Sequence, residues 1–569
     1  MTHTTETGID RSHRRVIFAS SLGTVFEWYD FYLYGSLSAI ISRQFFSGVD
    51  ETTGFIFALL AFAAGFFVRP FGALVFGRLG DRVGRKHTFL ITILIMGLST
   101  AIVGVLPSYA SIGVAAPVTL ITLRLLQGLA LGGEYGGAAT YVAEHAPYGR
   151  RGVYTSWIQT TATLGLFLSL LVILACRLAL GPAFETWGWR IPFLLSIALL
   201  AVSVYIRLQL QESPVFVEIR DEGKLSAAPL TEAFGRWPNL RIVLLALLGA
   251  TAGQAVVWYG GQFYALFFLE KILQVESSAA NLMIAAALAI GTPFFVLFGW
   301  LSDRIGRKRI VLAGCALAAL TYFPAFAALT RYANPALGDA VARSPVVVVA
   351  DPADCSFQFD PVGKTAFTRS CDVAKAALSR AGVPYSNRPA AAGSVARVEI
   401  GAAPPAQAGD AAATPAGASA GGSAAIDSFR GEALDKAAFA GANARFVAQL
   451  KEGLAAAGYP PRADMSRVDH PRVIMVCAWL VILVTMVYGP IAAWLVELFP
   501  TRIRYTSMSL PYHVGNGWFG GFLPVTSFAI VAATGDIYAG LWYPVGVAAA
   551  SCVIGALFLR ETYRDHLPA

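Results

Sequence analysis

Hydrophobic residues occur along the chain in long stretches that short polar segments separate. A window of about 19 residues, the length that a helix needs to cross a hydrocarbon core of about 30 Å, finds twelve such stretches. A charge-rich segment at about 210–241 divides them into two groups of six. The twelve predicted transmembrane helices lie near 17–42, 55–77, 88–107, 115–139, 154–179, 189–209, 242–269, 278–301, 310–330, 472–498, 505–533 and 538–560.

The composition agrees with a membrane protein that crosses the bilayer many times. Of the 569 residues, 56% are hydrophobic and only 14% are charged, and the mean hydropathy is +0.59, which is too apolar for a soluble protein of this length. The net charge of +8 is therefore attributed to membrane topology and gives no indication of a nucleic-acid partner.

The distribution of Lys and Arg among the short loops predicts the orientation. Basic residues concentrate after the second, fourth and eighth predicted helices, and the positive-inside rule places those loops in the cytoplasm. The loop at 107–115 carries no charge. Both termini are therefore expected in the cytoplasm of a multi-pass inner-membrane protein. The basic residues are Arg78, Arg82, Arg85, Lys86, Arg150, Arg151, Arg304, Arg307, Lys308 and Arg309.

The two groups of helices carry related sequences. The second helix ends in FGRLGDRVGRK (76–86) and the eighth ends in FGWLSDRIGRK (298–308). A second pair, EHAPYGRRGVYTS (144–156) and ELFPTRIRYTS (497–507), shares the pattern Glu-x-x-Pro-x-x-x-Arg. Two six-helix repeats of this kind indicate an alternating-access transporter, with its substrate site at the midplane between the halves.

The spacing of these motifs locates an insertion in the second repeat. Asp81 and Asp303 are 222 positions apart, whereas Glu144 and Glu497 are 353 apart, so the second half carries 131 extra residues between its third and fourth helices. By the orientation argument this segment is extracytoplasmic. The predicted divisions are 1–209, the N-terminal half; 210–241, a cytoplasmic linker; 242–330 and 471–569, the C-terminal half; and 331–470, a periplasmic insertion.

The insertion reads as a small α/β domain. Strands are predicted at 344–351 and 396–401, and helices at 371–385 and roughly 428–457. An Ala/Gly/Pro-rich linker at 403–425 separates the second strand from the last helix. Cys355 and Cys371 are predicted to form a disulfide, because the pair lies outside the cytoplasm; two free cysteines are the alternative.

Four motifs, in order, resemble those of the major facilitator superfamily and of its bacterial metabolite:proton symporter family. They are EWYDFYLYG (27–35), RPFGALVFGRLGDRVGRK (69–86), RLLQGLALGGEYGGAATYVAEHAPYGRRG (124–152) and ELFPTRIRYTSMSLPYHVGNGWFGG (497–521). The resemblance covers both membrane halves but not the insertion. It implies transport of citrate, 2-oxoglutarate, other dicarboxylates, shikimate, or proline and betaine, usually with protons.

Charged residues at membrane depth are the candidate coupling and binding groups. Glu27 and Asp30 share one helix face about 4.5 Å apart along the axis. Carboxylates at this depth are costly unless they line water or meet a partner, so both are candidates to carry a proton, and so is Glu134. Arg124 is a candidate ligand for a carboxylate substrate. The alternative for all four is a constitutive ion pair or a packing role.

Further polar and aromatic residues at membrane depth complete the predicted binding site. Gln254, Trp258 and Gln262 follow one another at four-residue spacing, which favours one face of a helix. Packing is the alternative for the aromatic residues. The predicted substrate ligands besides Arg124 are Gln127, Gln254, Trp258, Gln262 and Tyr488.

The repeated basic loops receive a gating role from the family resemblance. The charge clusters would bridge neighbouring helix ends and break as the halves rock, although the basic residues also satisfy the positive-inside rule without any gating role. The predicted gating residues are Asp81, Arg82, Arg85, Asp303, Arg304 and Arg307.

Enzyme functions find little support in the sequence. DPVGKTAF (361–368) lacks the glycine that a phosphate loop needs five positions before its Gly-Lys, and we find no metal-ligand spacing and expect no cofactor. The predicted protein is a monomeric, all-α membrane symporter of twelve helices that moves a small organic anion, in particular a mono-, di- or tricarboxylate, with protons. The alternatives are a proline/betaine-type zwitterion symporter and a transporter-derived receptor that senses a ligand through the insertion.

Overall fold

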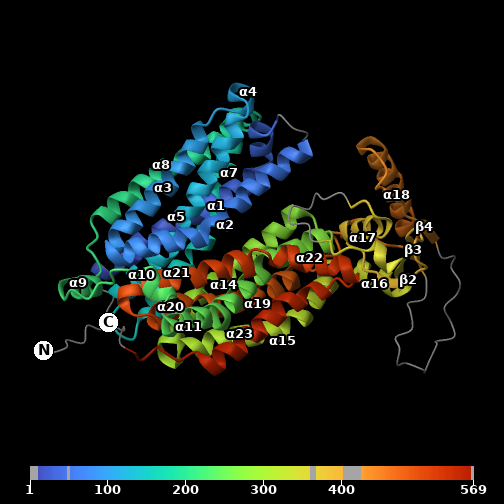
Figure 1. Cartoon of the computed structure of the whole chain (residues 1–569). Coiled ribbons are helices and arrows are strands. Elements are labelled where there is room, and N and C mark those ends of the chain that lie inside the picture. The colour runs from blue at the N-terminus through green and yellow to red at the C-terminus, as the bar shows by residue number, and fades with distance from the viewer. Residues whose placement is uncertain (1–10, 48–50, 359–366, 402–423, 566–569) are drawn as a thin grey trace.

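The computed structural model consists of two helical bundles and a small appended domain (Figure 1). Outside the description lie the side chains of 11–20, 39, 51–64 and 66. The structure describes residues 11–47, 51–358, 367–401 and 424–565.

The N-terminal half contains six long helical segments joined by short turns. Apolar residues along each segment pack it against its neighbours, and the short α4 (Tyr109–Ile112) and η1 (Phe184–Gly188) lie in the connections. The long segments are α1 (Arg11–Phe45), α2 (Glu51–Arg82), α3 (Arg85–Val105), α5 (Ala115–His145), α6 (Arg151–Gln159) continued by α7 (Thr161–Leu180), and α8 (Arg190–Leu208).

The C-terminal half repeats this arrangement after the connecting helices α9 (Pro214–Asp221) and α10 (Pro229–Phe234). Its first segment alternates α-helix with π-helical turns. The segments are α11 (Trp237–Ala246) through α12 (Ala252–Tyr259), η3 (Gly260–Tyr264) and η4 (Phe268–Ile272); α14 (Ser277–Ile305); α15 (Arg307–Ala333); α19 (His470–Tyr488) with α20 (Ile491–Leu498); α21 (Arg504–Val514) through η7 (Gly515–Gly520) to α22 (Leu523–Thr534); and α23 (Trp542–Phe558).

Within the described residues, ten helical segments are long and apolar enough to cross a membrane. The long helices α1 and α2 are not among the ten, and they occupy the places of the first two predicted helices. The total of twelve therefore stays a prediction.

The repeated loops have the same local structure in both halves. Gly84 and Gly306 stand between the paired helices with φ of 131° and 117°, a conformation that favours glycine. Glu212 accepts hydrogen bonds from the first backbone N–H groups of α3, and Glu561 does the same for α15. A carboxylate at a helix N-terminus is favourable, so each helix begins at an equivalent capped position.

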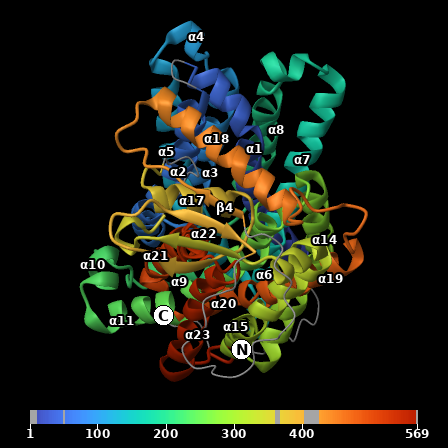
Figure 2. The same ribbon diagram turned by 90° about the vertical axis from the view of Figure 1, so that its right-hand side faces the viewer.

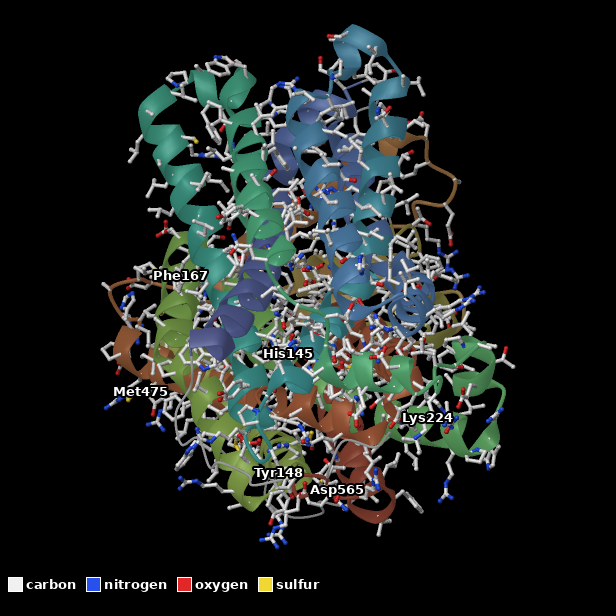
Figure 3. The ribbon with its side chains drawn as sticks, turned by 90° about the vertical axis from the view of Figure 1, so that its left-hand side faces the viewer. His145, Tyr148, Phe167, Lys224, Met475 and Asp565 are labelled. Carbon is white, nitrogen blue, oxygen red and sulfur yellow. A yellow bond between two sulfur atoms is a disulfide. The ribbon has the colours of Figure 1, made fainter. Side chains whose placement is uncertain are left out.

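The two halves contact each other at the end that carries these loops, which we call the basic-loop end, and their ribbons diverge toward the opposite end (Figure 1). There α2 packs along α21, and α6 packs along α14. The C-terminal segment also crosses to the N-terminal half, where Tyr148 donates a 2.6 Å hydrogen bond to the carbonyl of Arg564. Figure 3 shows Tyr148 beside Asp565 at this end.

The insertion forms a four-stranded mixed sheet with helices at its sides. The strand order is β2-β1-β3-β4, with β1 parallel to β2 and antiparallel to β3. Most of the predicted linker, 402–423, lies outside the described residues. The elements are α16 (Pro335–Arg343), β1 (Val346–Ala350), η5 (Pro352–Asp354), α17 (Ser370–Arg380), β2 (Ser386–Pro389), β3 (Arg397–Ile400), β4 (Ala424–Asp427) and α18 (Lys436–Ala456).

This domain is docked on the C-terminal half, at the end of the bundle that we call the insertion end (Figures 1 and 2). The backbone N–H of Tyr385 donates to the carbonyl of Gly535 at 2.9 Å, and Asn387 donates to the carbonyl of Thr534 at 2.8 Å. The Lys375 ammonium donates to the carbonyl of Ala533. Burial at this contact lowers the pKa of Lys375. The described part of the insertion is therefore fixed to the end of α22.

Cys355 and Cys371 form a disulfide with Cα atoms 5.1 Å apart. It joins the segment after η5 to the first turn of α17. The other four cysteines, Cys176, Cys315, Cys477 and Cys552, are free and lie in the long helices.

Candidate functional site

A small cavity lies between the two halves and receives side chains from both. The open space is about 20 Å³, so side chains have to move before an organic molecule can enter. The lining residues are Glu27, Trp28 and Arg69 from the N-terminal half, and Trp258, Tyr259, Tyr488, Tyr512, His513, Asn516 and Gly517 from the C-terminal half.

Glu27 and Arg69 are the charged residues of this cavity. The Arg69 guanidinium lies 3.9 Å from the Glu27 carboxylate, and the side chains are 14% and 8% exposed. This is a loose ion pair, at the outer limit of contact, whose two partners stay accessible to the cavity.

Asp30 belongs to a tighter cluster within the N-terminal half. The Arg124 guanidinium donates to its carboxylate at 3.0 Å and stacks 3.8 Å from the ring centroid of Tyr34. Gln127 donates to Asp30 at 3.4 Å and to Thr100 at 2.8 Å. The ion pair that is the alternative to a binding role for Arg124 is thus present, with Asp30 as the partner.

A second small cavity connects this cluster with Arg69. It is lined in part by Asp30, Arg69, Arg124 and Gln127. Among the described residues, the Nε and Nη2 atoms of Arg124 find no hydrogen-bond partner. Because a buried guanidinium normally uses its donors, Arg124 retains donors for a further acceptor.

Glu134 lies apart from both cavities, in an ion pair of its own. Its carboxylate accepts hydrogen bonds of 2.8 Å from Arg207 and from Thr92. The Arg207 guanidinium also stacks 3.5 Å from the ring centroid of Phe89. The carboxylate and the guanidinium are both 1% exposed. This geometry favours the packing role for Glu134 over proton transfer.

The predicted stripe in the first helix of the C-terminal half is only partly assembled. Trp258 lines the central cavity, and among the described residues its indole Nε1 has no hydrogen-bond partner. Gln254 exchanges 3.2 Å hydrogen bonds with Asn516, which also lines the cavity. Gln262 is buried but does not line it, because the π-helical turn η3 interrupts the four-residue periodicity.

Aromatic residues close the cavity toward the basic-loop end. Tyr135 of α5 stacks on Tyr512 of α21 with centroids 3.6 Å apart, and the Tyr488 hydroxyl lies 2.7 Å from that of Tyr512. On another side, Trp28 and Trp258 meet across the halves with centroids 5.3 Å apart. The cavity is thus walled by flat rings contributed by both halves.

The predicted gating residues lie at the basic-loop end, where four of the six join the halves or brace the contact. Asp81 accepts hydrogen bonds from the backbone N–H groups of Tyr505 and Thr506, and Asp303 accepts from those of Gly152 and Val153.

Arg85 donates to the carbonyl of Thr501 in the other half at 2.6 Å. Arg307 forms ion pairs with Asp303 and Glu497 in its own half. Arg82 and Arg304 are exposed and take no part in these contacts.

Two partners of these loops were not predicted as site residues, Glu144 and Glu497. Glu144 pairs with Arg504 of the other half at 2.8 Å, and Glu497 pairs with Arg151 at 3.3 Å. Both glutamates had been identified in the repeat motif, and this repetition was the signal that marked them as equivalent. We call the contacts of Asp81, Asp303, Glu144 and Glu497 across the halves the basic-loop clasp.

Arg69 and His513 are among the cavity residues that the sequence analysis did not select. Arg69 lies inside the apolar window 55–77, so the criterion applied to Asp30 would also have found it. His513 is 2% exposed, and its Nε2 has no hydrogen-bond partner among the described residues. Unsatisfied polar atoms facing a cavity are typical of ligand sites or water sites.

Comparison with known proteins identifies two matching family models and several relatives. Residues 16–232 match the family model described as "Sugar (and other) transporter", and residues 139–350 match "MFS/sugar transport protein". The shikimate transporter of Escherichia coli strain K12 is 36% identical over 325 residues, which cover 56% of this chain and 72% of the transporter. The alpha-ketoglutarate permease of that strain is 35% identical over 329 residues, 57% of this chain and 74% of the permease.

The proline/betaine transporter of the same strain is 35% identical over 331 residues, and the match spans 65% of its length, slightly less than two thirds. Solved structures of XylE share the fold at low identity. A double Trp mutant has a TM-score of 0.59 at 13% identity, with 97% of this chain and 96% of XylE covered. The proton:xylose symporter XylE bound to 6-bromo-6-deoxy-D-glucose has a TM-score of 0.58 at 14% identity, with 98% and 97% covered.

Proposed function

Because this chain belongs to the major facilitator superfamily and its metabolite transporters, which are membrane transporters and not enzymes, we propose that it carries a small organic anion together with protons by alternating access. The observation that carries the proposal is Arg69, a cation in a cavity between the two halves, loosely paired with Glu27. Arg124 stands next to it, across the second cavity.

Arg69 and Arg124 together suit a carboxylate substrate. A guanidinium can donate two parallel hydrogen bonds to one carboxylate, and both arginines line the same small cavity. Gln254, Trp258 and Tyr488 would contact the remainder of the substrate. A substrate carboxylate that pairs with Arg69 displaces Glu27, and a displaced glutamate is better accommodated in its neutral form at this depth. Substrate binding and proton uptake are thereby linked.

Asp30 is the second proposed proton-coupling residue. It shares Arg124 with the substrate path, so a carboxylate that recruits Arg124 would weaken the 3.0 Å contact to Asp30. Glu134 is proposed to stabilise the N-terminal half instead. The basic-loop clasp is proposed to open while the other end closes, and the basic-loop end is proposed to face the cytoplasm of a bacterial inner membrane.

A zwitterionic substrate is the second candidate, and the aromatic walls of the cavity favour it. Trp28, Trp258 and Tyr259 present faces that could hold a quaternary ammonium. Glu27 would add an anionic partner while Arg69 held the carboxylate. In this case Glu27 and Arg69 both contact the zwitterion, and neither charge is left to bind a second carboxylate.

Uptake into proteoliposomes under an imposed pH gradient tests the proposal. The panel is di- and tricarboxylates, shikimate-like and aromatic acids, proline and betaine. Arg69→Gln should lower the affinity for an anionic substrate by about 10- to 100-fold, which is the loss expected for a charge-assisted hydrogen bond. Arg380→Gln, an exposed arginine of the insertion, is the matched control and should leave uptake unchanged.

The results separate the two candidates. If only betaine-like compounds accumulate and Glu27→Gln abolishes their binding, the zwitterion function replaces the anion function. If no compound crosses the membrane while binding persists, transport itself is wrong and the receptor alternative is favoured.

A further inference from the structure

Two adjoining depressions lie on the C-terminal half where the insertion meets the membrane helices. One is a cavity of about 590 Å³ at the junction of α15, α16 and the start of α19. The other is a groove of about 500 Å³ between α15 and α19. Tyr332 and Arg472 line both, so the two form one continuous surface, which we call the junction groove.

The two parts of the junction groove differ in chemistry. The cavity carries three arginines, Arg331, Arg467 and Arg472, against two carboxylates, Asp339 and Asp469. Arg472 pairs with Asp469 at 3.2 Å, and Arg467 approaches Asp339 only to 4.0 Å. Within the described residues Arg331 is exposed and makes no ion pair or side-chain hydrogen bond. The cavity therefore has a net positive charge and one unused guanidinium.

The groove is mainly apolar and faces outward from the bundle. Pro324 and Ala328 of α15 leave space that larger side chains would fill, and Met475 of α19 is 62% exposed beside them. Figure 3 shows Met475 at the outer surface of the helices. Trp479 donates to the Thr321 hydroxyl at 3.2 Å and closes the far end. The junction groove as a whole thus runs from this apolar groove to the basic cavity.

The length of the groove matches one leaflet of a bilayer. Thr321 and Tyr332 are eleven residues apart on one helix, which corresponds to about 16 Å, and half of a hydrocarbon core of about 30 Å is about 15 Å. The basic cavity would then lie at headgroup level, and the apolar groove at the level of acyl chains.

We propose that the junction groove binds one anionic phospholipid of the leaflet at the insertion end, with its phosphate against Arg331 and Arg472 and an acyl chain along Ala328 and Met475. A free anion has the charge to enter the cavity but nothing to place in the apolar groove, whereas a phospholipid fills both. The headgroup would contact α16 and the residues just before α19 together, and so would hold both connections of the insertion to the bundle.

Purified protein with its full chain is mixed with short-chain phosphatidylglycerol, short-chain phosphatidylcholine or inorganic phosphate, and binding is followed by native mass spectrometry and by the shift in Tm. Phosphatidylglycerol should bind and raise the Tm, and inorganic phosphate at the same concentration should not. Arg331→Gln should lower the affinity for phosphatidylglycerol about fivefold, which is the effect of one basic residue near an anionic headgroup. Arg331 is chosen because its removal leaves no carboxylate unpaired.

Ala328→Trp fills the groove and should abolish lipid binding without altering the arginines. Leu320→Trp, at an exposed position of α15 outside the groove, and Arg380→Gln are the matched controls and should bind as the unaltered chain does. The proposal is overturned if inorganic phosphate alone gives the same Tm shift and Ala328→Trp binds normally, which identifies a site for a free anion. It is equally overturned if phosphatidylcholine binds as tightly, or if the groove variants match their controls.

Discussion

Asp81 and Thr506 join the two halves of the molecule through a 2.8 Å hydrogen bond from the backbone N–H of Thr506 to the Asp81 carboxylate. Thr506 lies in the first turn of α21, so the carboxylate meets the positive end of that helix. Asp303 makes the equivalent contact with Val153 in the first turn of α6, also at 2.8 Å. The repeat that is visible in the sequence thus appears as a pair of equivalent contacts across the halves.

Asp303→Asn should favour the state in which the basic-loop end is open. The amide keeps the shape but loses the charge, and it cannot accept equally well from both Gly152 and Val153. A loss of about 1 kcal/mol would shift the equilibrium between states roughly fivefold. The separation of the two loops is measured by double electron–electron resonance between spin labels at the exposed positions Val83 and Ile305.

Unchanged distance distributions in Asp303→Asn would contradict a role of this contact in closing the basic-loop end. Asp427→Asn, in an exposed ion pair of the insertion, is the matched control and should leave the distribution as it is.

Gly299→Ala should open the same end by a steric route. An added Cβ would lie 2.7 Å from the carbonyl oxygen of Gly152 and would also collide with Ser156, so α14 and α6 could not keep their present approach. Gly546→Ala adds the same methyl group where no atom lies within 4 Å, and serves as the control. The same spin-label pair should report a wider separation for Gly299→Ala alone. A distribution equal to that of Gly546→Ala would show that this helix approach does not limit closure.

The sequence contains clear signals for the clasp and weak ones for the cavity. Repeated motifs identified Asp81 and Asp303 because both halves need the same contact. Arg69 lies inside the apolar window 55–77, so the criterion of a charge at membrane depth applies to it as it does to Asp30 and Arg124. Gln262 was predicted to follow Gln254 and Trp258, yet the π-helical turn at Gly260–Tyr264 changes the register there, and no residue pattern announced that turn.

The docking of the insertion could not be read from the sequence at all. Tyr385 and Asn387 bind backbone carbonyls at the end of α22, and a backbone carbonyl is present at every position of any chain. Only the three-dimensional structure identifies which carbonyls are used.

Asp30→Asn should abolish accumulation driven by a proton gradient and spare some substrate exchange, because the amide keeps the contact with Arg124 but cannot carry a proton. The measurement is uphill uptake compared with counterflow in the same vesicles. Undiminished uphill uptake would remove Asp30 from the coupling mechanism. Glu134→Gln is the comparison, because its partner Arg207 is buried within the N-terminal half. It should lower the yield of folded protein and leave the ratio of uphill uptake to counterflow unchanged in what folds.

Arg124→Lys should markedly weaken the binding of an anionic substrate. An ammonium cannot replace the planar guanidinium, which stacks on Tyr34 and contacts Asp30 at 3.0 Å. Substrate binding is measured as the concentration that half-saturates counterflow. Normal transport of a neutral or zwitterionic compound by Arg124→Lys would reject the carboxylate substrate.

The disulfide provides a test of orientation that does not depend on transport. If the insertion end faces the periplasm, the bond between Cys355 and Cys371 persists there, and closing this short loop stabilises the insertion by about 3 kcal/mol in the chain-entropy model. A membrane-impermeant maleimide should therefore label intact cells at these cysteines only after reduction.

The variant Cys371→Ser sharpens this test, because it frees Cys355, which is partly exposed, and not the buried Cys371. Cys355 should then label in intact cells without reductant. The free cysteines of the long helices, such as the buried Cys315 and Cys477, supply the background for unreacted thiols. If Cys355 labels only after the inner membrane is permeabilised, the insertion lies in the cytoplasm. In that case the assignment of the basic-loop end to the cytoplasm is reversed, and the direction in which the basic-loop clasp opens is reversed with it.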